Sequence, residues 1–81
     1  MQREQAGPVV TVNGQVVRRR VDWREGLSLA EALLEAEYTG TTTPVSLRIT
    51  RGGRPISVTM RRFLSGSQNP ILEPNDVIEV R

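Results

Sequence analysis

Hydrophobic residues recur with a period of two along much of this 81-residue chain, which is typical of β-strands with one buried face. Asn13-Gly14 and Gly52-Gly53 interrupt the pattern with residues that accept the positive φ angles of a two-residue hairpin turn. The sequence therefore predicts two β-hairpins and one strand at the end of the chain. The five predicted strands are residues 8–13, 15–23, 45–50, 54–60 and 77–80.

The period changes to that of an α-helix within residues 24–38. Ser28 is a suitable N-cap, and Glu31, three residues later, completes a capping box. The helix is expected to end near Tyr38, with Gly40 closing its C-terminus. The apolar face, which is expected to be buried, is formed by Leu29, Ala30, Leu33, Leu34 and Ala36.

Residues 61–69 follow neither period, so we expect irregular chain that crosses the sheet. Phe63-Leu64 is expected to close the core from a short turn, and Ile71-Leu72 to anchor the crossing. A turn follows at residues 73–76, in which Asp76 is expected to accept hydrogen bonds from nearby backbone amides.

The order of elements is hairpin, helix, hairpin, irregular crossing and final strand. A lone helix after the first hairpin must pack its apolar stripe on one face of the sheet. The apolar character of the final strand favours a central position, paired with the first strand. We therefore predict an α+β fold of the β-grasp type, with a mixed sheet of four or five strands on one α-helix. Residues 8–81 form this single domain, and residues 1–7 are a polar leader or linker.

Composition removes several classes of chemistry. The chain has no cysteine and no histidine, which excludes disulfides and thiolate metal sites and removes the usual general base. Glu73 and Asp76 invite interpretation as a catalytic carboxylate pair, but turn hydrogen bonding explains them more simply. We therefore expect no enzyme activity, no metal and no cofactor. No apolar run approaches the roughly 20 residues of a membrane-spanning helix.

Arginine supplies the candidate binding residues. The net charge is +2, and all eleven basic residues are arginine, whose planar side chain forks onto phosphates and carboxylates. The clusters at residues 18–20 and 61–62 predict a patch for phosphate or an anionic glycan, with solvated strand and loop arginines as the simpler alternative. No aromatic residues are interleaved with these clusters, so nucleic acid binding is not expected.

Aromatic residues stand at the ends of two predicted elements. Trp23 ends the second strand and Tyr38 ends the helix, where either ring can face a partner or a sugar; a position at the edge of the core is the alternative. The ligand-binding or partner-binding residues that the sequence favours are Arg18, Arg20, Tyr38, Arg61 and Arg62.

Four motifs give the chain a family resemblance. Residues 10–16 are similar to the pattern V-x-V-x-G-x-V, and residues 26–33 to G-x-T-L-x-E-A-L. Residues 45–53 are similar to a V-x-V-x-R-x-G hairpin, and residues 69–80 to N-x-x-L-x-P-G-D-x-I-x-V. In this order they resemble the SLBB domain, the soluble-ligand-binding β-grasp module of bacterial polysaccharide export proteins. Asn75 replaces the glycine of the last motif, and asparagine is the best substitute where φ is positive.

This resemblance implies one domain of a larger envelope protein for polysaccharide export, in the periplasm or cell envelope. Such domains contact neighbouring copies or a soluble ligand, and recognition is expected at an exposed strand edge or at the loops beside the helix. The chain also resembles the sulfur carriers similar to ThiS and MoaD. Their chemistry needs a C-terminal Gly-Gly, whereas this chain ends in Val80-Arg81, so the alternative is a cytoplasmic partner protein without carrier chemistry.

Overall fold

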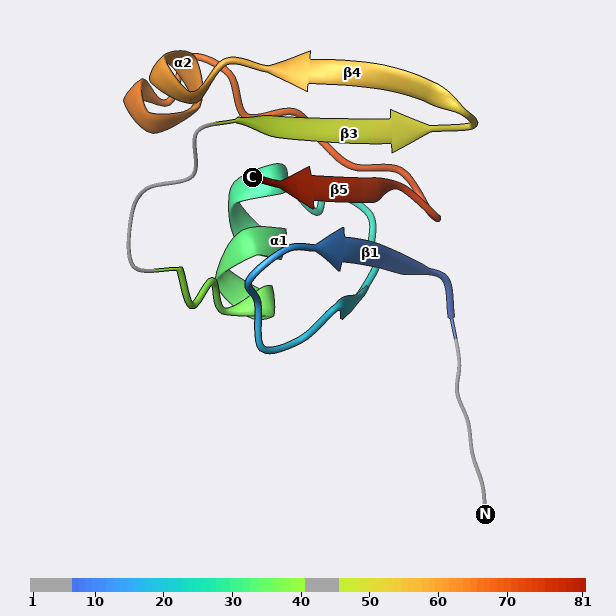
Figure 1. Cartoon of the computed structure of the whole chain (residues 1–81). Coiled ribbons are helices and arrows are strands. Elements are labelled where there is room, and N and C mark those ends of the chain that lie inside the picture. Colours follow the sequence, from blue (N-terminus) through green and yellow to red (C-terminus); the bar gives the residue numbers. More distant parts are fainter. Residues whose placement is uncertain (1–6, 41–45) are drawn as a thin grey trace.

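The computed structural model describes residues 7–40 and 46–81 and has an α+β fold with a mixed five-stranded sheet (Figure 1). The strand order is β2-β1-β5-β3-β4, in which β1 and β5 are parallel and the other neighbours are antiparallel. The elements are β1 (Val9–Asn13), β2 (Arg20–Asp22), α1 (Leu29–Ala36), β3 (Leu47–Arg51), β4 (Arg54–Val58), α2 (Met60–Ser65) and β5 (Val77–Val80).

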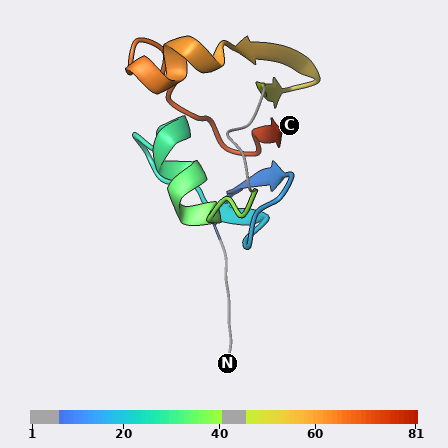
Figure 2. The ribbon, with the colours of Figure 1, turned by 60° about the vertical axis from the view of Figure 1, so that its left-hand side comes forward.

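The final strand occupies the centre of the sheet beside the first strand, as predicted. Ile78 and Val80 are buried, because a central strand with one covered face must place its apolar residues on that face. Both helices lie on the same side of the sheet (Figure 2). The buried apolar residues are Val10, Val12, Val21, Leu27, Leu29, Ala32, Ala36, Leu47, Ile49, Val58, Leu72, Ile78 and Val80.

The start of α1 confirms the predicted capping box. The Ser28 hydroxyl accepts a hydrogen bond from the Glu31 backbone N–H, and the Glu31 carboxylate accepts one from the Ser28 N–H. The predicted C-terminal glycine cap is wrong. Glu37 takes the left-handed conformation instead, with φ of 60°, and ends the helix at Ala36. Ending there lets Tyr38 form a bridge with Val16 of the preceding loop.

The first predicted hairpin is also wrong in its turn. Val10 pairs with Val21, so residues 13–14 do not form a two-residue turn, and β2 is shorter than the predicted strand 15–23. The intervening loop runs to the end of α1, where the N–H groups of Val17 and Arg18 donate to the Ala36 carbonyl at 3.0 and 2.9 Å. This carbonyl has no partner within the helix, so the detour satisfies a polar group that a tight hairpin would leave unpaired.

The second hairpin agrees with the prediction. Gly52 and Gly53 have φ of 57° and 81°, as a two-residue turn between twisted strands requires. The first residue of the predicted strand 45–50 lies outside the described residues, as do residues 1–6 of the predicted leader.

The predicted irregular crossing contains a short second helix, α2. Within it Phe63 packs against the core, but Leu64 is 66% exposed and does not close it. The anchor of the crossing is Leu72, which is buried, while Ile71 is exposed. The turn after it is confirmed, since Asn75 has a positive φ of 71°.

Candidate binding site

An apolar groove of about 530 Å³ lies between α1 and α2. One wall is formed by α1 and by the two residues that follow it, Glu37 and Tyr38. The other wall is formed by Phe63 of α2. The lining residues are Ala30, Leu33, Leu34, Glu37, Tyr38 and Phe63. We call this feature the α1–α2 groove.

The α1 wall of the groove is a second apolar stripe on the helix. The buried residues of α1 are Leu29, Ala32 and Ala36, spaced i, i+3 and i+7, and these pack on the sheet. The stripe that lines the groove is displaced by one residue and consists of Ala30, Leu33 and Leu34, with the charged C-cap residue Glu37 at its end. Leu34 is 77% exposed, which corrects the prediction that it is buried. Helix α1 therefore has more apolar surface than the sheet covers.

Tyr38 lies at the C-terminal end of the groove and is half-buried. Its ring packs against the core and also lines the groove. Tyr38 therefore lies at the edge of the core and on a candidate binding surface, the two alternatives that the sequence left open. A side chain on Gly40 would overlap the Tyr38 ring, so glycine at position 40 is required by close packing and not by the helix end.

Arg18 is close to the groove but is engaged with the helix. Its guanidinium forms an ion pair with Glu37 and donates to the Glu35 carbonyl at 3.3 Å. A cation at the C-terminus of a helix also interacts favourably with the helix dipole. Arg18 therefore contacts the lining residue Glu37, and its charge is already neutralised by that ion pair.

The arginines of α2 differ in direction. Phe63 points into the groove, and at about 100° per residue Arg62 lies on the flank of that face while Arg61 lies on the opposite side of the helix. Neither arginine has an acidic partner in the described part of the chain. Arg62 does not line the groove, but of the two arginines it is the one closer in direction to Phe63.

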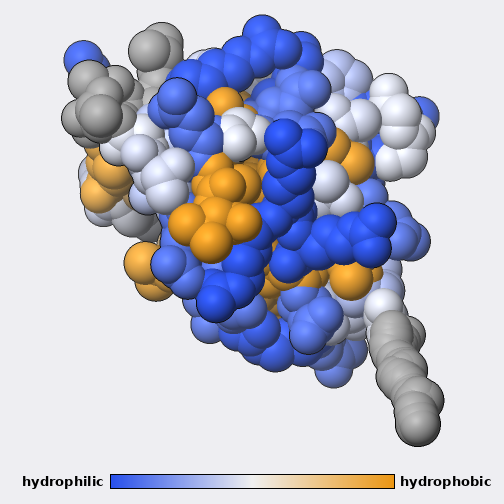
Figure 3. All heavy atoms as spheres, turned by 60° about the horizontal axis from the view of Figure 1, so that its bottom comes forward, coloured by the Kyte–Doolittle hydropathy of each residue, from blue (hydrophilic) through white to orange (hydrophobic). Residues whose placement is uncertain are grey.

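Arg20 is separate from this group. It lies on β2, at the opposite edge of the sheet from β4, which leads into α2. Viewed from the β2 side, the surface is mostly hydrophilic, with several small hydrophobic areas between the polar side chains (Figure 3). Of the predicted binding residues, only Tyr38 lines the groove, and Arg18 bonds to the lining residue Glu37. Arg61 and Arg62 lie on α2 outside the lining, and Arg20 is at the far edge of the sheet.

Sequence reasoning found only Tyr38 among the groove residues. Ala30, Leu33, Leu34 and Phe63 were missed because they were assigned to the core, and Glu37 was not singled out at all. One signal in the sequence was informative. Ala30, Leu33 and Leu34 form a complete i, i+3, i+4 stripe beside the Leu29, Ala32, Ala36 stripe, and one face of a small sheet cannot cover both.

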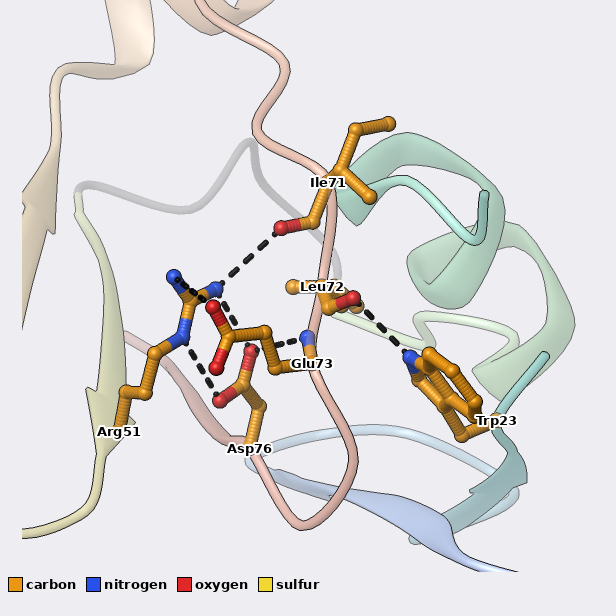
Figure 4. A network of polar contacts seen from close by, with 6 residues as sticks. All are labelled: Trp23, Arg51, Ile71, Leu72, Glu73 and Asp76. Atoms are coloured by element: carbon orange, nitrogen blue, oxygen red, sulfur yellow. Dashed lines mark hydrogen bonds and ion pairs between the residues drawn. The ribbon is translucent and has the colours of Figure 1, made fainter. Parts of the chain in front are cut away.

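The carboxylates of the turn after the crossing are structural. Asp76 is 1% exposed and accepts hydrogen bonds from Arg51 Nε at 3.1 Å, from Arg51 Nη2 at 2.9 Å and from the Glu73 N–H at 2.8 Å (Figure 4). The hydrogen bond to Asp76 raises the pKa of the Arg51 guanidinium above its ordinary value, against the opposing effect of burial. The predicted bond from Asp76 to a backbone amide is confirmed.

The crossing segment is held from two sides. Arg51 of β3 also donates to the Ile71 carbonyl at 3.2 Å, and on the other side Trp23 Nε1 donates to the Leu72 carbonyl at 3.0 Å (Figure 4). The backbone of this segment also bonds to the chain before α1, from the Leu29 N–H to the Pro70 carbonyl at 2.9 Å and from the Leu72 N–H to the Leu27 carbonyl at 2.8 Å. The two side chains supply partners for the carbonyls of residues 71 and 72. Trp23 is therefore engaged in holding the crossing.

A second ion cluster lies at the C-terminal end of β5. The Glu79 carboxylate accepts hydrogen bonds from Arg48 of β3, at 2.9 Å for Nε, and from Arg81 at 3.3 Å. The hydrogen bond from Arg48 is the main cause that lowers the pKa of Glu79 below 4.5, opposed by partial desolvation and aided by the charges of both arginines.

This lowered pKa predicts a pH dependence. A carboxylate whose pKa is lower in the folded state stabilises the fold above the unfolded pKa and loses that contribution as the pH falls through the folded value. The difference in stability between the wild type and Glu79→Gln should therefore be largest at neutral pH and should shrink below about pH 4.5. Urea unfolding of both proteins across this range measures it, and a constant difference would contradict the assignment.

Among residues 7–40 and 46–81, no group of three or more aspartate, glutamate, histidine or cysteine side chains is placed to hold a metal ion. No helix in the same residues has the length and hydropathy that a membrane crossing requires. The sequence matches no protein-family model and no curated protein.

Proposed function

We propose that the chain is a β-grasp domain and that it acts as a non-enzymatic binding and assembly module of the SLBB type. The parallel pairing of β1 and β5 at the centre of the sheet supports the β-grasp assignment, together with the packing of α1 against β1 and β2. The family resemblance extends this to one domain of a larger bacterial envelope protein for polysaccharide export.

The observation that carries the binding role is the α1–α2 groove. Ligand sites in proteins are mostly apolar hollows of roughly 300–1,000 Å³ with a few polar groups at the edge, and a groove of about 530 Å³ falls in this range. Leu34 and Phe63 form the apolar surface, Tyr38 supplies an aromatic face with a hydroxyl, and Arg62, on the helix that carries Phe63, is the proposed source of positive charge. This combination suits a sugar ring that carries an acidic group.

The energetic contribution of the groove comes mainly from its exposed leucine. Covering an exposed leucine completely contributes about 2 kcal/mol, and a ligand that lies across Leu34 covers part of it. Arg62 adds a charge-assisted hydrogen bond if the ligand carries a carboxylate or phosphate. We therefore expect modest affinity for a single small ligand.

The experiment titrates isotope-labelled protein with oligogalacturonate, an anionic oligosaccharide, and follows the backbone amide resonances. Shifts are expected at α1 residues 30–37, at Tyr38 and at Phe63. Leu34→Gln should weaken the binding about ten-fold, because it removes apolar surface worth about 1.4 kcal/mol.

Leu64→Gln is the matched control. Leu64 is a leucine of similar exposure on α2 that does not line the groove. It should leave the affinity unchanged. Equal losses in the two variants would contradict the groove assignment. The binding role of the groove fails if oligogalacturonate shifts none of these resonances.

A further inference from the structure

The backbone of β2 has polar groups that face away from the sheet. The Arg19 carbonyl accepts from the Val12 N–H at 2.6 Å, and the Trp23 N–H donates to the Pro8 carbonyl at 3.0 Å. In an antiparallel pair, residues alternate between those that bond to the neighbour and those that face outward. Arg20 and Asp22 therefore direct their N–H and C=O groups away from β1, at the edge of the sheet.

The opposite edge of the sheet is less open to pairing. The Ser46 and Arg81 backbones bond to each other between β3 and β5, so alternate residues of β3 direct their backbone groups toward β4. In the β3–β4 register, the backbone groups of residues 55 and 57 therefore face outward from the sheet. Residue 55 is proline and has no N–H. The outward N–H of Ser57 remains, but that of Thr59, just after the strand, donates to the Gln68 side chain at 3.0 Å. Strand addition is therefore disfavoured at β4 and remains available at β2.

The side chains at the β2 edge carry opposite charges. Arg20 and Asp22 are both exposed and lie on the same face of the sheet, away from α1. Neither has an ion pair or side-chain hydrogen bond with any residue in the described part of the chain. One strand thus presents a cation and an anion two positions apart, with Val21 between them.

We infer that β2 pairs antiparallel with β2 of a second copy of this chain, centred on Val21. In this register Arg20 of each copy lies opposite Asp22 of the other, which forms two ion pairs between the copies. It also matches each outward N–H with an outward C=O, because Arg20 and Asp22 become the hydrogen-bonded pair of the new ladder. The edge is complementary to itself in both charge and backbone, as a two-fold interface requires.

The residues that flank this pairing fit as well. Continuing the register places Arg19 of one copy opposite Trp23 of the other, on the face that carries α1. Arg19 is exposed and without an acidic partner in the described residues, and an arginine over an indole ring forms a cation–π contact. Trp23 is the only tryptophan, so its fluorescence reports on the interface.

The interface is small, because β2 has three residues. Contacts of this size form weak, concentration-dependent dimers, which become effective when other domains or a common surface bring the copies together. This inference rests on the assembly part of the proposed function, and it uses a surface separate from the α1–α2 groove.

Charge reversal tests the register. Asp22→Arg places arginine opposite arginine in both ion pairs, and Arg20→Asp places aspartate opposite aspartate. Each variant alone should weaken self-association in sedimentation velocity about ten-fold or more relative to the wild type. An equimolar mixture of the two variants restores both pairs, and so does the double variant Arg20→Asp/Asp22→Arg. Both should associate about as strongly as the wild type.

The outcomes separate this inference from the groove. Wild-type protein that stays monomeric at all concentrations overturns the pairing, as does self-association that both single variants leave unchanged. Failure of the mixture and the double variant to recover also overturns the register, provided that their amide spectra show folded protein. Leu34→Gln should leave self-association unchanged. Slower hydrogen exchange at the Arg20 and Asp22 amides with rising concentration is the independent second measurement.

Discussion

Replacing Asp76 by alanine is expected to lower the free energy of unfolding by about 3 kcal/mol, because it leaves a partly buried guanidinium and a backbone amide without their acceptor. The carboxylate is 1% exposed and bonds Arg51 twice and the Glu73 N–H once. Arg51 is 29% exposed and keeps its bond to the Ile71 carbonyl, which places the loss at the lower end of the range for broken buried ion pairs. Urea unfolding at neutral pH measures the effect.

Glu73→Ala is the matched control for this prediction. Glu73 forms an ion pair with the same guanidinium at 3.2 Å, but its side chain is 60% exposed. Solvent screens an exposed pair, so its loss should lower the stability by less than about 1 kcal/mol. Similar losses in the two variants would mean that burial of Asp76 does not set the strength of this network. For a domain of this size, a loss of about 3 kcal/mol is a large fraction of the total stability.

The features that the sequence predicted correctly depend on short-range chemistry. The capping box needs only Ser28 and Glu31, and the second hairpin needs only the two glycines of its turn. The Asn75 turn likewise follows from one residue that tolerates a positive φ. In each case the residues that decide the conformation lie within four positions of one another, so a pattern in the sequence contains the whole interaction.

The features that were missed depend on distant partners. The loop after β1 avoids a tight turn because its N–H groups bond the Ala36 carbonyl, a partner about twenty positions away. Likewise, Leu34 is exposed because the sheet covers only one of the two apolar stripes on α1. The sequence does not show how wide a face the sheet will cover. Only the three-dimensional arrangement determines it.

The candidate site was predictable in part for the same reason. Tyr38 was singled out because it ends the helix, and it does line the groove. Arg61 and Arg62 were equivalent as letters in the sequence. They differ only because α2 forms there and points Phe63 inward, which leaves Arg62 on the flank and Arg61 behind. A helix that was not predicted thus separates two residues that the sequence treats alike.

Gly14 is the position where an added methyl group would meet the backbone of the central strand. A Cβ at this residue would lie 2.7 Å from the Val80 carbonyl oxygen and 3.0 Å from the Val80 Cβ. Its φ of 144° is also a conformation that residues with side chains rarely adopt. Gly14 therefore matters because the chain passes close to the central strand there, and it is not part of a two-residue turn. The glycine of the first family-like motif is thus needed for this close approach, and not for the Asn-Gly hairpin turn that the sequence predicted.

Gly14→Ala is accordingly expected to lower the free energy of unfolding by about 2–4 kcal/mol, through backbone strain and overpacking against β5 together. Gly52→Ala is the control, since Gly52 also has a positive φ, of 57°, but has no atom within 4 Å of an added Cβ. It should lower the stability by about 1–2 kcal/mol, from the left-handed conformation alone. Chemical denaturation of both variants compares them. Equal losses would show that β5 moves aside at no cost, which a central strand bonded to β1 and β3 on its two sides opposes.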